Sequence, residues 1–443
     1  MQTLVWYPAQ ASVATSMTVA DYASLLSTET SFGEPAITSR TEAMRNALST
    51  TLATPMWSVR DALPAPGRFP VIVYAPGFSS MAWENADLCE YLASHGYIVL
   101  ASPNMGAMTR EMTCDRAGVD TQARDISFLI GYAGSLPNTD LTRMAVIGFS
   151  WGGLSNLFAA ARDNRIGALV ALDGSLRYSP GWVREAGDVH PQRMSIPLLS
   201  FEQQLFTIED HERYISEARR AGPSVLNAWT HADLMTVHML GMVHWEFSSM
   251  YQRSEAMWSV YFPVQQKADY SRHDGAVGYA WMARYVREFV DAYLKGDVSS
   301  AEFLRRTPAE NGVPRHSMAT RFRAGSGNAA CLDGLRQQVG AKGFDQLAHL
   351  YAQFRQADPQ FELDCVAVES WADELMGIAR FAEAIALLEF SAQLYPDQAR
   401  AHAALAAAYR RSGQKARADA CFRVALEKDP LNLEARFHLQ EPG

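Results

Sequence analysis

Short apolar runs alternate with amphipathic stretches through most of the first 310 residues, and this alternation constrains the fold more than any other feature of the sequence. Runs this apolar are typical of parallel strands, which are buried on both faces of a sheet. The amphipathic stretches between them have helical spacing and supply the right-handed crossovers that parallel strands need. The pattern predicts an α/β fold, a doubly wound and mostly parallel sheet. The runs span residues 69–74, 97–101, 144–147, 166–172, 196–200 and 234–240.

Ligands of such sheets bind beyond the carboxyl ends of the strands, so the residues that follow each run are where chemistry is expected. The run 144–147 leads into Gly148-Phe-Ser-Trp-Gly152, which is G-x-S-x-G, and a helical pattern follows. In this context the serine occupies a sharp turn that raises its hydroxyl above the sheet, and the glycines leave room for the neighbouring backbone. We expect Ser150 to be a nucleophile. The alternative is a serine in a tight strand-to-helix turn with no chemistry.

A serine hydroxyl needs a base to accept its proton, and in this context the chain order is Ser, then Asp, then His. Asp173 directly follows the run 166–172, so its carboxylate is expected at the carboxyl end of a strand, where it would orient the histidine. The alternative is a turn or capping residue, because Gly174 follows it. Asp188 and Asp210 are rivals, but neither directly follows an apolar run.

Six histidines lie between Asp173 and residue 315. His244 is the expected base because it lies in the short segment 241–247, just after the last apolar run. His238 lies inside that run and His231 precedes it. The candidates that compete with His244 are His231, His238 and His273, and the remaining two histidines are His190 and His211.

Negative charge develops on the substrate oxygen during acyl transfer, and two backbone N–H groups usually stabilise it. We expect these to come from Trp151, directly after the nucleophile, and from Phe78, in the loop after the first central run. The alternative at Phe78 is an ordinary turn. Phe149 and Trp245, together with those two residues, suggest an aromatic pocket for an ester with a short or medium acyl chain, although aromatic residues beside a sheet are as often core.

These motifs occur in one order, and together the sequence resembles platelet-activating-factor acetylhydrolase-like and dienelactone-hydrolase-like proteins over about residues 1–315. The resemblance implies an α/β-hydrolase with Ser150, Asp173 and His244 as triad and Phe78 and Trp151 as backbone donors. It departs from the family at Pro76, where a histidine is common, and in having serine where dienelactone hydrolases have cysteine. The segments that carry it are Trp6–Pro8, Pro76–Phe78, Leu92–Tyr97, Gly148–Gly153, Leu172–Asp173 and Val243–Phe247.

A second pattern begins after a Gly-rich, polar linker at residues 316–328. Pro396 and Pro430 are 34 residues apart, and the large and small residues before Pro430 have the spacing of a tetratricopeptide repeat, which residues 329–443 resemble. We therefore expect a hydrolase domain at 1–315 and an all-α repeat domain at 329–443. The repeat domain would act as a surface for a protein partner or for self-association. The alternative is a helical cap on the hydrolase.

The net charge of −9 argues against a nucleic-acid partner. The sequence has no metal-binding or phosphate-binding motif, so no metal and no cofactor are expected, and no run is long enough to span a membrane. The expected activity is ester hydrolysis on a small molecule, with a peptidase, a thioesterase or a non-catalytic scaffold as alternatives.

Residues 4–7 read as a strand, so further residues could precede them in a longer chain. A periplasmic or secreted location therefore stays open. The five cysteines are expected as thiols, with a Cys89–Cys114 bridge as the alternative in an exported protein.

Overall fold

The chain forms two compact units, Met1–Gly327 and Asn328–Gly443, and each is described by itself. The computed structural model describes residues 2–29, 42, 43, 46–204, 222, 224–254, 256, 269–326, 332–359 and 361–440.

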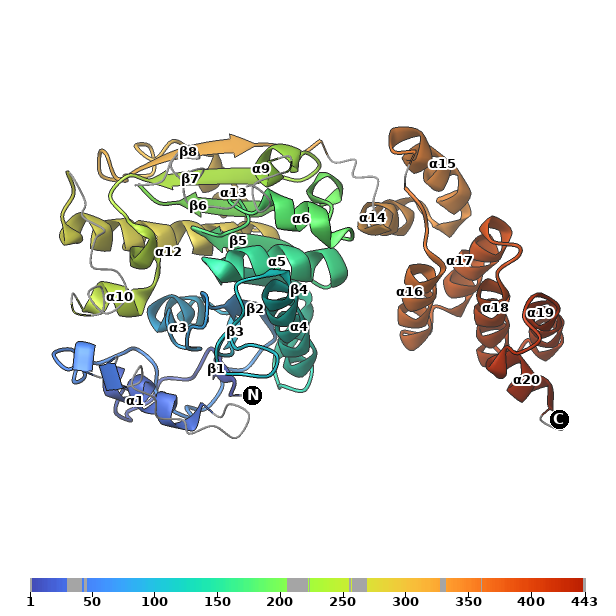
Figure 1. Cartoon of the computed structure of the whole chain (residues 1–443), viewed down its shortest axis with the longest axis horizontal. Coiled ribbons are helices and arrows are strands. Elements are labelled where there is room, and N and C mark those ends of the chain that lie inside the picture. The colour runs from blue at the N-terminus through green and yellow to red at the C-terminus, as the bar shows by residue number, and fades with distance from the viewer. Residues whose placement is uncertain are drawn as a thin grey trace. The chain divides into compact units, whose positions relative to one another are not determined.

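The first unit is built on one eight-stranded sheet with the order β1-β3-β2-β4-β5-β6-β7-β8 (Figure 1). The six central strands, β2 to β7, are parallel, and the edge strands β1 and β8 are antiparallel to their neighbours. Each of the six predicted apolar runs forms one of the parallel strands. The prediction of an α/β fold with a mostly parallel sheet is therefore confirmed. The strands are β1 (Leu4–Trp6), β2 (Phe69–Ala75), β3 (Ile98–Ala101), β4 (Thr139–Phe149), β5 (Ala168–Leu172), β6 (Leu198–Glu202), β7 (Leu234–Met239) and β8 (Met318–Arg323).

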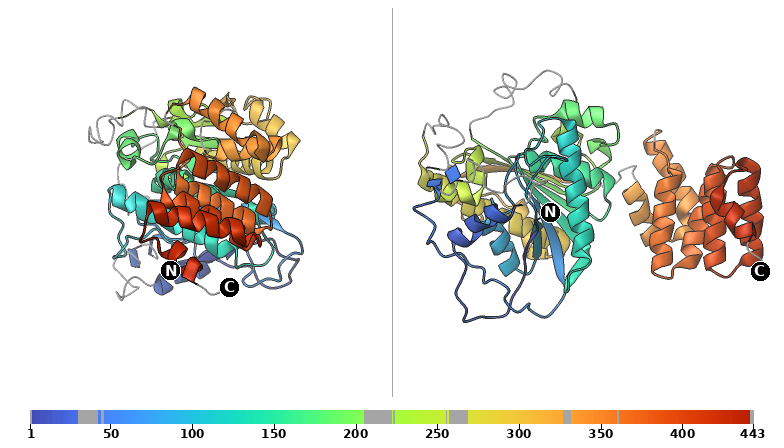
Figure 2. Two further views of the ribbon diagram at one scale, coloured as in Figure 1. Left: turned by 90° about the vertical axis from the view of Figure 1, so that its right-hand side faces the viewer. Right: turned by 60° about the horizontal axis from the view of Figure 1, so that its bottom comes forward.

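Helices cover both faces of the sheet, as the right-hand view of Figure 2 shows. Successive side chains of a strand point to opposite faces, so the buried residues of each strand divide between two apolar cores. One core packs against α1 (Val19–Ser24), α3 (Ala86–Ser94), α10 (Ser249–Arg253), α12 (Arg272–Leu294) and α13 (Val298–Arg305). The other core packs against α4 (Arg116–Ala133), α5 (Trp151–Arg162), α6 (Pro180–Ala186) and α9 (Val225–Ala228).

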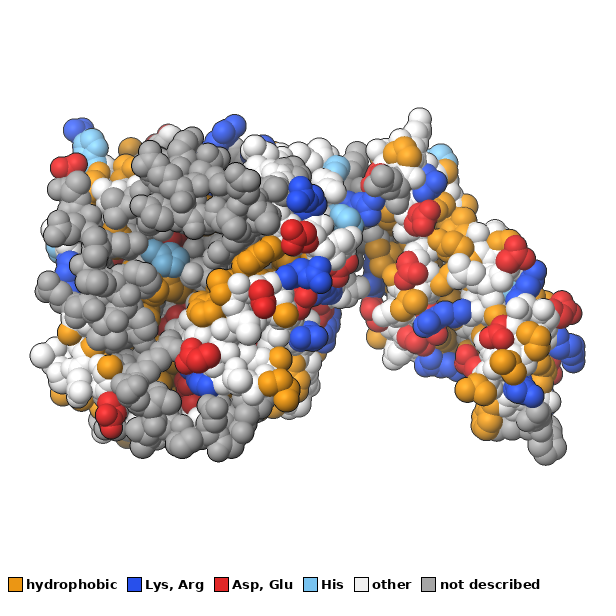
Figure 3. Space-filling view, viewed as in Figure 1, with side chains coloured by type: hydrophobic (Ala, Val, Ile, Leu, Met, Phe, Trp, Pro, Cys, Tyr) orange, Lys and Arg blue, Asp and Glu red, His pale blue; other side chains and the backbone are white. Residues whose placement is uncertain are grey.

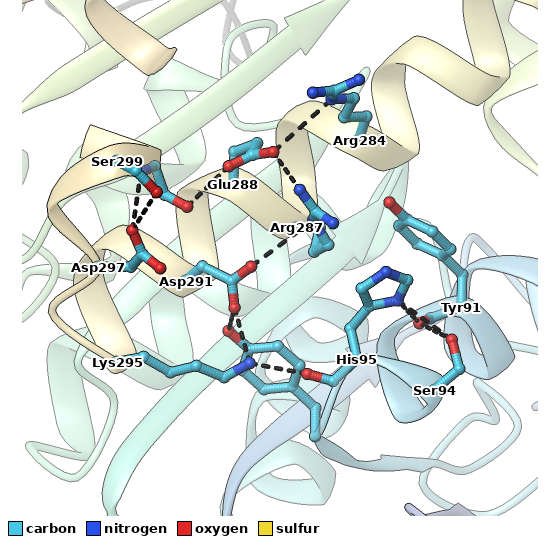
Figure 4. Close-up of polar contacts among 12 residues, drawn as sticks. Tyr91, Ser94, His95, Arg284, Arg287, Glu288, Asp291, Lys295, Asp297 and Ser299 are labelled. Atoms are coloured by element: carbon cyan, nitrogen blue, oxygen red, sulfur yellow. Dashed lines mark hydrogen bonds and ion pairs between the residues drawn. The ribbon is translucent and has the colours of Figure 1, made fainter. Parts of the chain in front are cut away.

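Helix α12 is also fixed by polar contacts to the turn between α3 and β3 (Figure 4). Asp291 accepts a hydrogen bond of 2.6 Å from the hydroxyl of Tyr97 and lies 2.7 Å from the Lys295 ammonium. The same ammonium donates to the carbonyl of His95 at 2.8 Å. These contacts join segments about 200 residues apart in sequence, so they help to set the angle at which α12 crosses the sheet.

Strand β8 corrects the predicted linker at residues 316–328. Residues 318–323 pair with β7 as an antiparallel edge strand, from Met318 opposite Met239 to Arg323 opposite Leu234. Of this strand only Met318 is buried, because an edge strand of this kind has one face toward solvent. Its sequence, Met-Ala-Thr-Arg-Phe-Arg, contains no apolar run and is less conspicuous than the Gly-rich stretch that follows.

The second unit is helical throughout its described residues, and Figure 2 shows its helices side by side. The residues that suggested a repeat are buried between α18 and α19, including Ala406, Tyr409, Ala418, Phe422 and Ala425. Basic and acidic side chains are interspersed on the face of this unit seen in Figure 3. The helices are α14 (Leu332–Lys342), α15 (Leu347–Ala357), α16 (Cys365–Gly377), α17 (Phe381–Leu394), α18 (Ala399–Arg411), α19 (Lys415–Lys428) and α20 (Leu433–Gln440).

Within the described ranges, no helix combines the length and apolar character that crossing a membrane requires. Cys89 is buried and Cys114 is exposed, and both are free thiols, so the alternative of a bridge between them is not formed. Cys331 lies outside the described residues.

Candidate active site

The G-x-S-x-G segment forms the turn between β4 and α5. Ser150 has a φ of +52°, a strained conformation for a residue with a side chain. A Cβ atom added at Gly148 would lie 2.2 Å from the carbonyl oxygen of Gly152, and one at Gly152 would lie 2.1 Å from that of Ala75. Both distances are too short for any side chain, so the two glycines are required for a turn this sharp.

The structure brings the side chains of Ser150, Asp173 and His244 together in a line, from the ends of β4, β5 and β7. The Oγ of Ser150 lies 2.9 Å from Nε2 of His244, and Nδ1 of His244 lies 2.5 Å from Oδ2 of Asp173. The carboxylate is 1% exposed and the imidazole 19% exposed. A carboxylate at Nδ1 favours the tautomer with the proton on that nitrogen, which leaves Nε2 free to accept the proton of the serine.

Gln203 holds both the acid and the base, although no motif in the sequence singled it out. Its backbone N–H donates to Oδ1 of Asp173 at 3.1 Å, and its Oε1 accepts the backbone N–H of His244 at 3.0 Å. Gln203 directly follows β6, so it lies at the same edge of the sheet as the three predicted residues. Polar residues after every strand, and not only after β4, β5 and β7, would have identified it.

The end of β2 and the loop that follows it, residues 75–80, contain the predicted donor Phe78 and are called the oxyanion loop after that prediction. Its carbonyl groups accept hydrogen bonds from two neighbouring side chains: Gln122 donates to Pro76 at 2.8 Å and Asn104 to Gly77 at 2.9 Å. Among the described residues, the backbone N–H of Phe78 donates to none, and neither does that of Trp151. The two predicted donors are therefore available to a bound oxygen.

The weakly patterned residues 10–68, to which the sequence assigned no role, also reach this loop. Glu29 is buried and lies 2.7 Å from the guanidinium of Arg110. Arg110 in turn donates to the carbonyl of Ser79 at 3.3 Å. A charged pair from two distant segments therefore fixes the far end of the oxyanion loop.

The aromatic residues predicted to line a pocket differ in exposure. Phe149 is 1% exposed, and its ring centroid lies 4.9 Å from that of the His244 imidazole. Its ring therefore packs against the base and does not line an open pocket. Trp245 is half-buried and meets the imidazole edge-on at 5.1 Å. Phe78 is 41% exposed and contacts the ring of Trp151, which contacts that of Trp182.

The rival residues that the structure describes lie elsewhere in the first unit. Asp188 is paired with Arg162 at 2.7 Å, and His231 contacts the hydroxyl of Ser326 at 3.1 Å. His238 and His273 are exposed. Asp210 and His211 lie outside the described residues.

Comparison with known proteins gives two similarities. Residues 36–179 match the family model described as Chlorophyllase, a stretch that includes Phe78, Ser150 and Asp173. Among solved structures, the chain is similar to a ferulic acid esterase from Streptomyces cinnamoneus, with 21% identity over 67% of this chain and 83% of that chain and a TM-score of 0.45. The comparison with curated proteins gave no match.

Proposed function

We propose that this α/β-hydrolase cleaves carboxylic esters of small molecules through an acyl-enzyme on Ser150. The observation that carries the proposal is the continuous line of contacts from the Ser150 hydroxyl through His244 to Asp173. A hydroxyl in contact with an imidazole that is itself held by a buried carboxylate is the arrangement that activates a serine. The Chlorophyllase match over the segment that contains the serine and the acid supports the same reaction class.

The reaction would proceed in two halves. His244 takes the proton of Ser150 as its oxygen attacks the ester carbonyl, and the carbonyl oxygen becomes negatively charged in a tetrahedral intermediate. The backbone N–H groups of Phe78 and Trp151 would donate to that oxygen. The intermediate then breaks its bond to the alcohol, which leaves with the proton held by His244.

The second half repeats these steps with water. His244 takes a proton from the water, the hydroxide attacks the acyl-enzyme carbonyl, and Ser150 recovers its proton as the acid leaves. Asp173 would stabilise the positively charged imidazole in both halves without itself taking the proton.

The aromatic rings of Phe78, Trp151 and Trp182 support an apolar substrate next to the serine. Of these, Phe78 is the most exposed, so it would contact the bound ester directly. We propose esters with short or medium acyl chains as the first substrates to test.

The helices within residues 329–443 support a role other than catalysis. The antiparallel helix pairs α16–α17 and α18–α19, with small residues buried between the helices, are consistent with tetratricopeptide-like repeats. For this unit we propose a contact surface for a protein partner or a second copy of the chain. It contributes no side chain to the line Ser150–His244–Asp173.

The proposed reaction is tested with p-nitrophenyl esters of two to twelve carbons, compared with matched thioesters and anilides. We expect ester cleavage in the full chain and its loss in Ser150→Ala. Ser155→Ala is the matched control, because Ser155 lies five residues further along the chain, in α5, and among the described residues its hydroxyl donates to the carbonyl of Trp151. Preferred cleavage of thioesters or anilides would reassign the enzyme as a thioesterase or a peptidase, and no cleavage of any substrate would leave the scaffold interpretation.

A further inference from the structure

A second buried carboxylate lies beneath the oxyanion loop and takes no part in the line of contacts from Ser150 to Asp173. Glu84 is 1% exposed and comes from the turn that precedes α3. Its Oε1 accepts the backbone N–H of Gly77 at 2.7 Å and the hydroxyl of Tyr74 at 3.0 Å. Gly77 directly precedes Phe78, so this carboxylate fixes the peptide next to the proposed donor.

The same turn also holds the segment that carries the base. The carbonyl of Glu84 accepts the hydroxyl of Ser248 at 2.6 Å and the backbone N–H of Met250 at 3.1 Å. The side chain of Asn85 donates to the carbonyl of Phe247 at 2.9 Å and accepts the backbone N–H of Ser249 at 3.1 Å. Two consecutive residues therefore connect the oxyanion loop to residues 247–250, a few positions after His244.

A buried acceptor oxygen is well suited to this position. It cannot exchange its partners for water, so it holds the Gly77 N–H in one place. Burial raises the pKa of Glu84 to about 7, while the hydrogen bonds from Ser80, Gly77 and Tyr74 and the nearby His244 act in the opposite direction.

We propose that Glu84 is a positioning residue that fixes the Phe78 N–H for the transition state and keeps the oxyanion loop in register with His244. The inference rests on the proposed ester hydrolysis and deepens it. Without the acceptor at Oε1, the Gly77 N–H loses its buried partner, while the carbonyls of Pro76 and Gly77 keep the hydrogen bonds from Gln122 and Asn104. The loop is then fixed from one side, and the Phe78 N–H is held less closely at the developing oxyanion. The loss of this hydrogen bond would raise the free energy of the transition state much more than that of the bound substrate.

The chain offers a matched control six residues further along. Glu90, on α3, is 4% exposed and accepts one backbone N–H, from Trp57 at 2.7 Å, and one tyrosine hydroxyl, from Tyr22 at 2.7 Å. It therefore has the same burial and the same kinds of partner as Glu84, but it holds the segment 55–57 instead of the oxyanion loop. Any effect of removing a buried acid as such appears in both variants.

The experiment compares Glu84→Met, Glu84→Gln and Glu90→Met in the full chain. Methionine fills the volume of glutamate without an acceptor, whereas glutamine keeps Oε1. For hydrolysis of a p-nitrophenyl ester, we expect Glu84→Met to lower kcat by about 10- to 100-fold, part of the effect of losing an oxyanion donor, with KM changed by less than about threefold. Glu84→Gln and Glu90→Met should keep kcat within about threefold of the unmodified chain.

Binding of a boronic acid, which forms a tetrahedral adduct with serine, provides a second readout. Its affinity should fall in Glu84→Met by about the same factor as kcat and stay unchanged in Glu90→Met. If Glu84→Met does not fold, Glu84→Asp replaces it, since its carboxylate is one methylene too short to reach Gly77. The same loss of kcat is expected.

The outcomes separate this inference from the proposed function. An active unmodified chain whose kcat is retained in Glu84→Met, or lost equally in Glu90→Met, overturns the positioning role alone. Failure of glutamine to restore kcat also overturns it, because that would make the charge the functional property. A chain that cleaves no ester overturns the proposed function, and this inference with it.

Discussion

The most demanding prediction concerns Gly152, whose backbone lies against the end of β2. A Cβ atom there would be 2.1 Å from the carbonyl oxygen of Ala75 and 2.9 Å from that of Pro76. Both are backbone atoms that belong to the start of the oxyanion loop, so no side-chain rotation can relieve the contact. In Gly152→Ala either the loop or the Ser150 turn must move by about 1 Å to restore normal packing.

A displacement of about 1 Å between reacting groups costs roughly 100-fold in rate, and overpacking of this kind costs about 1–3 kcal/mol of stability. We therefore expect Gly152→Ala to lose about 100-fold or more in kcat/KM for a p-nitrophenyl ester. Steady-state kinetics, with circular dichroism to verify folding, provide the assay.

Gly131→Ala is the control for this substitution. Gly131 also lies in a helix, α4, but a Cβ atom there would meet nothing within 4 Å. Alanine at this position should raise stability by up to about 1 kcal/mol without changing the rate. A Gly152→Ala enzyme as active as Gly131→Ala would refute the argument that this glycine sets the geometry of the serine turn.

Three further predictions follow from the same structure. Asp173→Asn should lower kcat by about 10³- to 10⁴-fold in steady-state assays, because the amide favours the wrong imidazole tautomer; a nearly normal rate would place the acid elsewhere. Since the folded-state pKa of Glu84 is raised from 4.5 to about 7, its contribution to stability is complete below pH 4.5 and is lost as the pH rises to about 7. Urea unfolding at about pH 5 and about pH 8 should therefore show a loss, of order 3 kcal/mol, that Glu84→Gln lacks; the same pH dependence in both proteins would exclude this assignment. A chain that ends at Gly327 should keep its kcat for small esters, because Ser150, Asp173 and His244 all lie within the first unit. If the second unit mediates self-association, sedimentation velocity should show a smaller assembly for the shortened chain, and an unchanged assembly would contradict that role.

The parts of the fold that were predictable are those in which local pattern and burial agree. Strands β2 to β7 are buried on both faces, so each appears in the sequence as an apolar run that tertiary contacts only reinforce. Strand β8 has one face toward solvent and lies beside a Gly-rich stretch, so its residues read as a linker. Its pairing with β7 joins residues about 85 positions apart in sequence, and no local pattern encodes such a contact.

The same distinction applies to the candidate site. Ser150, Asp173 and His244 each follow an apolar run, so topology alone brings them to one edge of the sheet. Glu84 and Gln203 act through hydrogen bonds to groups in other segments of the chain, and nothing in their own neighbourhoods in the sequence marks those partners. The location of the chemistry was thus predictable, whereas the contacts that hold it in place required the structure.

Covalent labelling shows whether Ser150 is a nucleophile and whether His244 activates it. The full chain is treated with a fluorophosphonate, and the adduct is measured by intact mass and located by peptide mapping. We predict one adduct per chain on Ser150, absent in Ser150→Ala and formed far more slowly in His244→Ala, while His238→Ala labels at the normal rate. An adduct on another residue, or labelling of Ser150 that is equally fast without His244, would contradict the account.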